Sequence, residues 1–390
     1  MKAGRDGSAV PAGKPTYKKN EKSGCRRLSS FPAMAFPQMV FAGRPGLPEV
    51  RMNRSALRTG TTAGQLLVIN GATVEALVSA EEAIDLAEAA LRKTSSGVAD
   101  QDIRRTLAMP GMAGSCLSLM YASLSDRDCF GAKVLSVFPQ NFEHGLPSHQ
   151  GGVLLFEKGS GRPVALVNGH AITGLRTPAA TAVATRALSR PDACELAVIG
   201  YGEQADRHIE AIARVRSLSG VRVWGRDSGK ASAFAEAQRA KGFAARSFPT
   251  AREAVEGADI ICTVTSAKDP VLEGRWLSPG THVNAVGASV AGLRELDLDC
   301  VARSRIFVDY MAMAMTSASD LIEPLSQGLI DRSRIVGEIG AVLNGDVSGR
   351  RDASEITLYR SLGVPAQDIE LANFVYRRAQ DRGLGTRVPL

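Results

Sequence analysis

The chain has 390 residues, of which 44% are hydrophobic, and its formal net charge is +7. This length and apolar content are enough for two packed domains. Most of the charge lies in residues 1–58, which hold twelve Lys or Arg against three Asp or Glu, so the remainder is nearly neutral. This distribution excludes a folded basic groove, and no nucleic-acid partner is expected.

Residues 1–62 mix Gly, Pro, Ser and Lys without a lasting hydrophobic period. This composition predicts a basic disordered extension. It lacks a compact apolar segment followed by a small-residue cleavage site, which argues against export. A later start of translation, for instance at Met52, is the alternative explanation.

The spacing of cysteine, histidine and hydrophobic residues argues against C-x-x-C cysteine pairs, a metal site and a membrane span. The six cysteines are scattered without a C-x-x-C pair, which favours reduced thiols and a cytoplasmic location. The histidines form neither an H-x-x-x-H nor an H-E-x-x-H pair, so no metal site is predicted. No run of about 18 apolar residues occurs, so neither a membrane span nor a membrane partner is expected.

Residues 63–188 have the pattern of an α+β lobe. Leu66 to Ile69 reads as a strand, and Ser79 with Glu82 forms a capping box that opens a helix. Short β-type runs follow at 133–138, 153–156 and 164–168. Thr177 and Pro178 have the form of an N-cap and first helical residue, so we expect a helix over 177–188, with Arg176 just before its start.

A dinucleotide-binding βαβ unit is the next element. The apolar run Glu195–Ile199 leads into the G-x-G-x-x-A turn of residues 200–205, and Val221–Trp224 reads as the following strand. Gly200 permits the tight turn, and Gly202 lets the backbone approach a pyrophosphate at the N-terminus of a helix. The flanking strands and helix make this motif specific for a bound dinucleotide.

Strands and helices then alternate, with strands predicted at 195–199, 221–224, 244–248, 259–264, 281–286 and 305–309. They predict a Rossmann-type doubly wound parallel sheet over residues 189–319. Residues 320–390, with helices near 335–343 and 365–382, are expected to return to the first lobe. The fold class is therefore α/β, with a second α+β substrate and dimerisation lobe built from both chain ends.

The cofactor choice depends on the end of the second strand of the βαβ unit. Gly225 and Arg226 stand where NAD-binding domains commonly carry an acid, so NADP(H) is favoured over NAD(H), although Asp227 follows directly. The candidate cofactor-binding residues are Thr177, Gly200, Tyr201, Gly202, Glu203, Gln204, Arg226, Thr265, Ser266, Val286 and Gly287.

From about Gln65 to Ala379 the chain resembles the ornithine cyclodeaminase and μ-crystallin family, and within it the ketimine-reductase branch. The motifs that carry the resemblance are Arg105-Thr106, 132–134, 147–150, 172–177, 200–205, 284–289, 294–297 and 361–363. The resemblance implies a homodimer with a small amino or imino acid bound beside the nucleotide domain.

The resemblance also implies roles for three basic residues. Arg105 would grip the substrate carboxylate, and Arg176 would anchor a carboxylate or a phosphate. Lys133 would contact the substrate and manage a proton. Lys133 also stands out by itself, because it interrupts an apolar strand pattern and must be paired, snorkelled or functional.

Ala288 stands where cyclodeaminases of this family carry a carboxylate, so deamination is disfavoured. The predicted reaction is reduction of 1-pyrroline-2-carboxylate or 1-piperideine-2-carboxylate, by hydride transfer, to L-proline or L-pipecolate. Three alternatives stay open: ornithine or lysine cyclodeaminase, an alanine dehydrogenase-like enzyme, and an NADPH-dependent ligand-binding protein of μ-crystallin type without turnover.

Overall fold

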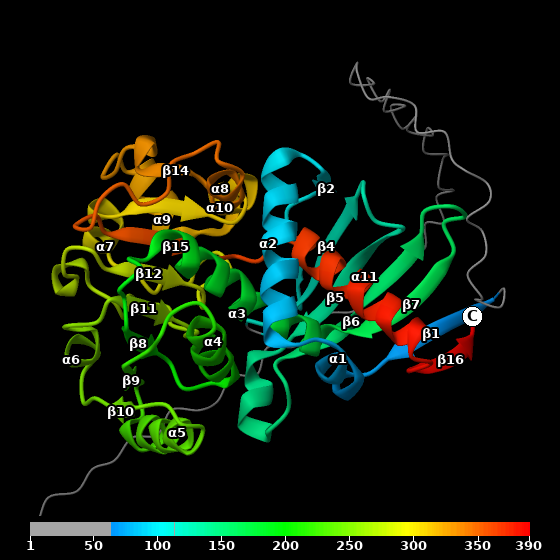
Figure 1. Cartoon of the computed structure of the whole chain (residues 1–390), viewed down its shortest axis with the longest axis horizontal. Helices are drawn as coiled ribbons and strands as arrows, with labels where there is room; N and C mark the ends of the chain where they lie inside the picture. The colour runs from blue at the N-terminus through cyan, green and yellow to red at the C-terminus, as the bar shows by residue number, and fades with distance from the viewer. Residues whose placement is uncertain (1–63, 113) are drawn as a thin grey trace, which may run out of the picture. The chain divides into compact units, whose positions relative to one another are not determined.

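The structure is a computed structural model that describes residues 64–112 and 114–390; the extension expected over residues 1–62 lies outside them. The described chain forms two sheets with helices packed on them (Figure 1). None of its helices is long and apolar enough to cross a bilayer. The expected α/β class with a Rossmann-type parallel sheet is confirmed.

The first sheet is mixed, and among the described residues it has eight strands. In spatial order they are β16 (Thr386–Pro389), β1 (Gln65–Ile69), β7 (Pro163–Asn168), β6 (His149–Glu157), β5 (Cys129–Val137), β4 (Cys116–Leu124) and β2 (Ala99–Gln101), with β3 (Arg105–Ala108) also paired to β4. A six-residue 3-10 helix, Pro139–His144, connects β5 to β6. The central strands alternate strictly, so Lys133 and its register partners Met120 and Val153 all lie on the buried face.

Helices cover that buried face: α1 (Gly71–Leu77), α2 (Ala80–Ser96), α3 (Gly169–Leu188) and α11 (Pro365–Asp381). Figure 1 shows α11, drawn in red, lying across the strands of the first sheet. The predicted capping box of α2 is present, because Ser79 and Glu82 each accept the other's backbone N–H. The last helix in the sequence, α11, thus completes the core on the first sheet.

The helix α3 begins eight residues earlier than the sequence indicated. Asn168 is its N-cap and accepts the N–H of Ala171, so Pro178 lies inside the helix and not at its first turn. Thr177 is not a cap; its Oγ1 donates to the carbonyl of Thr173. Arg176 therefore lies well inside a buried helix, which corrects its expected place before a helix start.

The second sheet is parallel throughout and has eight strands among the described residues. Their spatial order is β10 (Ala245–Ser247), β9 (Gly220–Trp224), β8 (Glu195–Ile199), β11 (Ile260–Thr263), β12 (His282–Ala285), β15 (Thr357–Arg360), β13 (Arg305–Val308) and β14 (Ile335–Glu338). Its helices are α4 (Glu203–Ala213), α5 (Ser228–Ala240), α6 (Ala251–Val255), α7 (Leu298–Arg303), α8 (Met311–Ser317) and α9 (Ser319–Ser326), with 3-10 turns at Gly274–Trp276 and Arg332–Arg334. The helix α10 (Ile339–Asn344) follows β14 and packs mainly against α2.

The division of residues 320–390 differs from the expected one. The strands β14 and β15 belong to the second sheet, and β15 is inserted between β12 and β13. The helices α10 and α11 and the strand β16 return to the first lobe as expected: α10 packs mainly against α2, and β16 pairs with β1. The sequence did not reveal this because β15 is a four-residue strand, and its partners lie far away in the chain.

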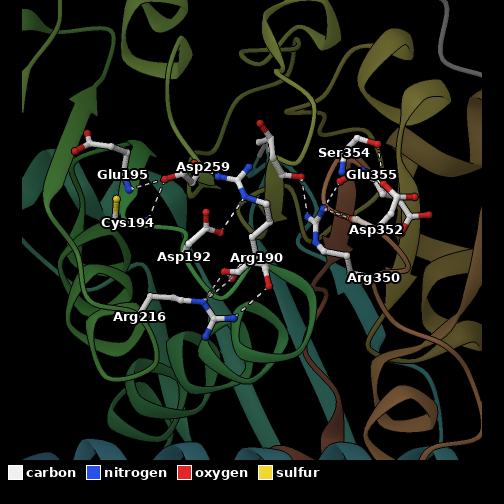
Figure 2. A network of polar contacts seen from close by, with 12 residues as sticks. Arg190, Asp192, Cys194, Glu195, Arg216, Asp259, Arg350, Asp352, Ser354 and Glu355 are labelled. Atoms are coloured by element: carbon white, nitrogen blue, oxygen red, sulfur yellow. Dashed lines mark hydrogen bonds and ion pairs between the residues drawn. The ribbon is translucent and has the colours of Figure 1, made fainter.

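A polar network holds the amino ends of the second sheet (Figure 2). Asp259 accepts the backbone N–H groups of Cys194 and Glu195 at 2.9 and 3.0 Å, and Arg190 donates to the same carboxylate at 2.5 Å. Arg350 donates to the carbonyl of Leu188 at 2.7 Å. This edge is thus fixed by internal contacts, whereas ligands of such sheets bind at the carboxyl edge.

Candidate active site

The glycine turn has the shape that a dinucleotide pyrophosphate requires. Gly200 has φ +131°, and a Cβ there would lie 3.0 Å from Val264, so only glycine fits. Gly202 is the N-cap of α4, and a Cβ on it would meet no described atom within 4 Å. Ala205 is fully buried between α4 and β8. The turn therefore leaves the start of α4 open to a phosphate, and the residues present fit the group.

Tyr201 and the segment after β9 pack together beside this turn. A Cβ on Gly225 would lie 2.2 Å from the Tyr201 ring, so the ring packs directly on that glycine. The carboxylate of Asp227 caps α5 by accepting the N–H of Lys230 at 3.0 Å. Arg226 is exposed between them. Because the Asp227 carboxylate faces a helix N-terminus, part of its negative charge is compensated there.

The loops that follow β11 and β12 are joined by one buried carboxylate, Glu295. It accepts hydrogen bonds from Thr263 Oγ1, from the N–H and Oγ1 of Thr265, and from the N–H groups of Gly287 and Ala288, at 2.6 to 3.2 Å. Burial raises the pKa of this carboxyl. The predicted residues Thr265 and Gly287 are thus brought together, whereas Ser266 is exposed and Val286 is buried.

Lys133 is buried in an ion-paired cluster with Asp368 and Arg176, which we call the Asp368 cluster. Lys133 Nζ lies 2.6 Å from Asp368 Oδ1, and Arg176 Nε lies 3.2 Å from the same oxygen. Lys133 Nζ also donates to Thr173 Oγ1 at 3.3 Å. Burial, opposed by Asp368 and reinforced by the positive charge of Arg176, lowers the pKa of Lys133 to about 7.

Helix α3 links this cluster to the helix that begins at the glycine turn. Thr173 and Arg176 lie one and two turns into α3, and His170 of the first turn has its Nε2 3.2 Å from Glu203 Oε2. Glu203 is the first residue of α4 and also accepts from Arg207. The predicted substrate residues Lys133 and Arg176 and the predicted cofactor helix α4 therefore all contact or belong to one helix, α3.

The structure does not bring Arg105 to this cluster. The Arg105 side chain is 62% exposed and donates to Asp102 at 2.8 Å. Its neighbour Arg104 points inward, where it donates to the carbonyls of Ser289 and Leu362 at 3.0 and 2.6 Å. Burial, followed by the positive charge of Arg176, lowers the pKa of Arg104. Sequence reasoning missed Arg104. It lies just before the four-residue strand β3, and so short a strand does not show which of two adjacent arginines points inward.

A turn beside Arg176 explains the Ser361-Leu362-Gly363 motif. Asp309 is buried and accepts the N–H groups of Leu362 and Gly363, each at 2.6 Å, and burial raises the pKa of this carboxyl. Gly363 has φ +77°, and a Cβ on it would lie 2.1 Å from Arg176 Nη1. The motif thus gives the Arg176 guanidinium the space that it occupies.

His149 completes the surroundings of the cluster. Partial burial, and then the positive charges of Lys133, Arg104 and Arg176, lower the pKa of His149 to about 4. Its Nδ1 lies 2.9 Å from Ser148 Oγ. The imidazole is therefore neutral near pH 7 and adds a polar group without a further charge.

Comparisons with known proteins identify the family. The model of the ornithine cyclodeaminase/mu-crystallin family matches residues 66–383. A Δ(1)-pyrroline-2-carboxylate reductase of Bacillus cereus is 34% identical over 325 residues, which are 83% of this chain and 99% of the relative.

Two solved structures share the fold. The Δ(1)-pyrroline-2-carboxylate reductase of Thermococcus litoralis, in complex with NADH and L-proline, has 34% identity and a TM-score of 0.80, covering 83% of this chain and 100% of its own. An archaeal alanine dehydrogenase dimer with bound NAD has 30% identity and a TM-score of 0.79, covering 84% and 99%. The resemblance found in the sequence motifs is confirmed: the chain belongs to the ornithine cyclodeaminase/mu-crystallin family.

Proposed function

We propose that this chain is an NAD(P)H-dependent reductase of cyclic ketimines, which converts 1-pyrroline-2-carboxylate or 1-piperideine-2-carboxylate into L-proline or L-pipecolate. The observation that carries the proposal is the buried Asp368 cluster, which is linked through α3 to the start of α4 and through Arg104 to the loop after β12. The L-proline and NADH in the Thermococcus litoralis structure support the same pairing of ligands.

The charges of the site suit a small carboxylate. Lys133, Arg176 and Arg104 face the carboxylates Asp368 and Asp309, which leaves one positive charge in excess while Lys133 is protonated. A buried excess charge is unfavourable until a ligand of opposite sign compensates it. The substrate carboxylate would supply that charge, and the guanidinium groups would orient it.

The chemistry requires one hydride and one proton. A bound reduced nicotinamide supplies the hydride to the imine carbon. Lys133 donates a proton to the imine nitrogen, whose basicity rises as the C=N π electrons move onto it, and solvent then reprotonates Lys133. Because its pKa is lowered to about 7, Lys133 can both lose and regain this proton near neutrality. Ala288 offers no carboxylate for deamination.

A substrate panel tests the proposal. The full chain is mixed with NADPH or NADH and either 1-pyrroline-2-carboxylate, 1-piperideine-2-carboxylate, or pyruvate with ammonia, and with ornithine for ammonia release. We expect kcat/KM for one cyclic imine to exceed that for pyruvate by about tenfold or more, equivalent to ~1.4 kcal/mol. Faster reduction of pyruvate would favour the alanine dehydrogenase alternative, which the archaeal neighbour supports. Ligand binding without turnover would favour the non-enzymatic one.

For the cofactor we propose NADP(H) over NAD(H). Arg226 is exposed at the end of β9, and Asp227 is engaged as the cap of α5. A 2′-phosphate bound at Arg226 would therefore meet a partly compensated carboxylate. Comparison of Kd for NADPH and NADH by fluorescence titration tests this choice, and tighter binding of NADH would contradict it.

We also propose a homodimer that forms through the outer face of the first sheet. Leu117, Tyr121, Val134 and Leu166 point outward from β4, β5 and β7 and are 37 to 41% exposed. A hollow of about 370 Å³ lies on the same face, beside Phe130 and Phe156. An exposed apolar face of this kind is typical of a protein–protein contact, and the archaeal neighbour is a dimer. A monomer mass for wild type in light scattering would contradict the dimer.

The location that we propose is the cytoplasm. Among the described residues, Cys116, Cys129, Cys194, Cys262 and Cys300 are free thiols. Free thiols are typical of a reducing compartment. Recovery of the enzyme in a secreted or periplasmic fraction would contradict this location.

A further inference from the structure

Asp368 has a role that the proposed reaction does not yet include. Its side chain is fully buried on α11, and its Oδ1 accepts from both Lys133 Nζ and Arg176 Nε. Its Oδ2 has no hydrogen-bond partner among the described residues. A carboxylate so placed is held by cations on one side only, so its position is set by Lys133 and Arg176, and theirs by it.

We propose that Asp368 is a positioning residue for the proton donor: it fixes the Lys133 ammonium against α3 and keeps it charged at the pH of turnover. This inference rests on the proposed ketimine reduction. In that step an N–H bond of Lys133 breaks and an N–H bond of the imine nitrogen forms. The hydride adds to the imine carbon, the nicotinamide is oxidised, and Lys133 regains a proton from solvent.

The geometry supports a role in aiming as well as in charge. Lys133 has a flexible side chain with three N–H donors, of which Asp368 Oδ1 and Thr173 Oγ1 accept two. These acceptors lie on two different helices, α11 and α3. The remaining N–H is thereby restricted in direction, and it is the one available to a substrate nitrogen.

The electrostatics of the cluster give the inference a measurable sign. The charged or titratable groups facing Lys133 are Asp368 from α11, Arg176 from α3, Arg104 before β3 and His149 from β6. The two arginines keep their charge and His149 is neutral above about pH 5. Asp368 is therefore the group in this set that favours the ammonium form of Lys133. Removal of the Asp368 carboxylate should lower the pKa of Lys133 further.

The experiment compares the pH dependence of kcat for wild type, Asp368→Asn and Asp368→Glu, with Glu370→Gln as a matched control. Glu370 lies on the same helix, is equally buried and is paired with Lys93 and Arg127. The kcat of wild type should fall as the pH rises through about 7, because Lys133 must be protonated; this fall is the alkaline limb of the pH profile. Asp368→Asn should move this limb to lower pH by about 1 to 3 units. Glu370→Gln should leave the limb in place.

Asp368→Glu separates position from charge. It keeps the carboxylate but displaces its oxygens, so we expect the limb to stay within about 0.5 unit while kcat falls about tenfold or more and KM changes less than about threefold. Fluorescence titration with NADPH checks that each variant is folded. If Asp368→Asn does not fold, Asp368→Glu decides by its kcat.

Two results would overturn the inference. One is an Asp368→Asn profile that coincides with wild type, and the other is a wild-type kcat for Asp368→Glu. Failure of the proposed function is distinguishable from both, because wild type itself would then show no imine turnover at any pH.

Discussion

Two carboxylates on the same helix each bind one lysine and one arginine, but they do so in different ways. Glu370 uses both oxygens, because Lys93 Nζ lies 3.0 Å from each and Arg127 Nε lies 3.0 and 3.1 Å from them. We call Glu370, Lys93 and Arg127 the Glu370 cluster. In the Asp368 cluster only Oδ1 accepts.

The cations of the two clusters differ in their surroundings too. The side chains of Lys93 and Arg127 are 13% and 28% exposed, whereas those of Lys133 and Arg176 are 2% and 7% exposed. The Glu370 cluster is thus a saturated ion pair at the edge of the core. The Asp368 cluster is more deeply buried and is incompletely paired, which is typical of groups that act on a ligand. A buried ion pair by itself does not indicate function. A carboxylate oxygen without a hydrogen-bond partner and an uncompensated positive charge are the features that do.

The largest effect is expected when the two lysines are compared directly. Lys133→Met should lower kcat for imine reduction by about 10² to 10⁴, the usual contribution of a positioned proton donor. Lys93→Met removes an equivalent charge from the other cluster and should leave kcat within about threefold. Steady-state kinetics with saturating NADPH measures both. Equal losses in the two variants would remove the distinction between the clusters.

The next effect is expected at Arg104, the further cation that lies beside the Asp368 cluster. Arg104→Ala should raise KM for the imine by about tenfold to a hundredfold, since a hydrogen bond to a charged group contributes ~1.5–3 kcal/mol. Arg105→Ala should change KM by less than about threefold, because its side chain is exposed and paired with Asp102. The family resemblance assigns this role to Arg105. A larger KM change in Arg105→Ala would restore that assignment.

A smaller effect is expected at the turn beside Arg176. Gly363→Ala places a Cβ at φ +77° and 2.1 Å from Arg176 Nη1, so the guanidinium must move. We expect a loss of about 1–3 kcal/mol in the free energy of unfolding and a several-fold rise in KM. Gly345→Ala, also at positive φ but with no described atom within 4 Å of its Cβ, is the control. Equal changes in KM would show that the turn does not position Arg176.

The last effect is expected at Arg226, at the end of β9 and away from both clusters. Arg226→Ala should weaken NADPH binding by about tenfold, equivalent to ~1.4 kcal/mol, and NADH binding by less than about twofold. Fluorescence titration with each nucleotide measures the two values of Kd. Loss of affinity for both nucleotides to the same extent is the outcome that the NADP(H) preference does not allow.

Local patterns in the sequence predicted the parts of the fold that depend on neighbouring residues. The glycine turn, the capping box at Ser79 and the six strands from β8 to β13 lie within one or two residues of their expected positions. Lys133 was identified because a charge on the inner face of a strand needs a partner. The pattern of Thr177 and Pro178 places the start of α3 too late, because Asn168 caps the helix earlier.

Long-range pairings could not be predicted in the same way. Asp368 is 235 residues from Lys133, and nothing in the pattern of α11 distinguishes it from Glu370 two residues later. Glu295 appeared only as part of a family motif, because its partners are backbone N–H groups of two separate loops. The insertion of β15 between β12 and β13 is likewise a consequence of packing between distant segments.

The most direct test of the account follows the hydride itself. Wild type and Lys133→Met are incubated with 1-pyrroline-2-carboxylate and NADPH deuterated at the transferred position, and the product is analysed by mass spectrometry. We predict L-proline carrying one deuterium at its α-carbon with wild type, and at least about a hundredfold less of it with Lys133→Met. Absence of labelled proline with wild type, or equal labelling by the two proteins, would contradict the account.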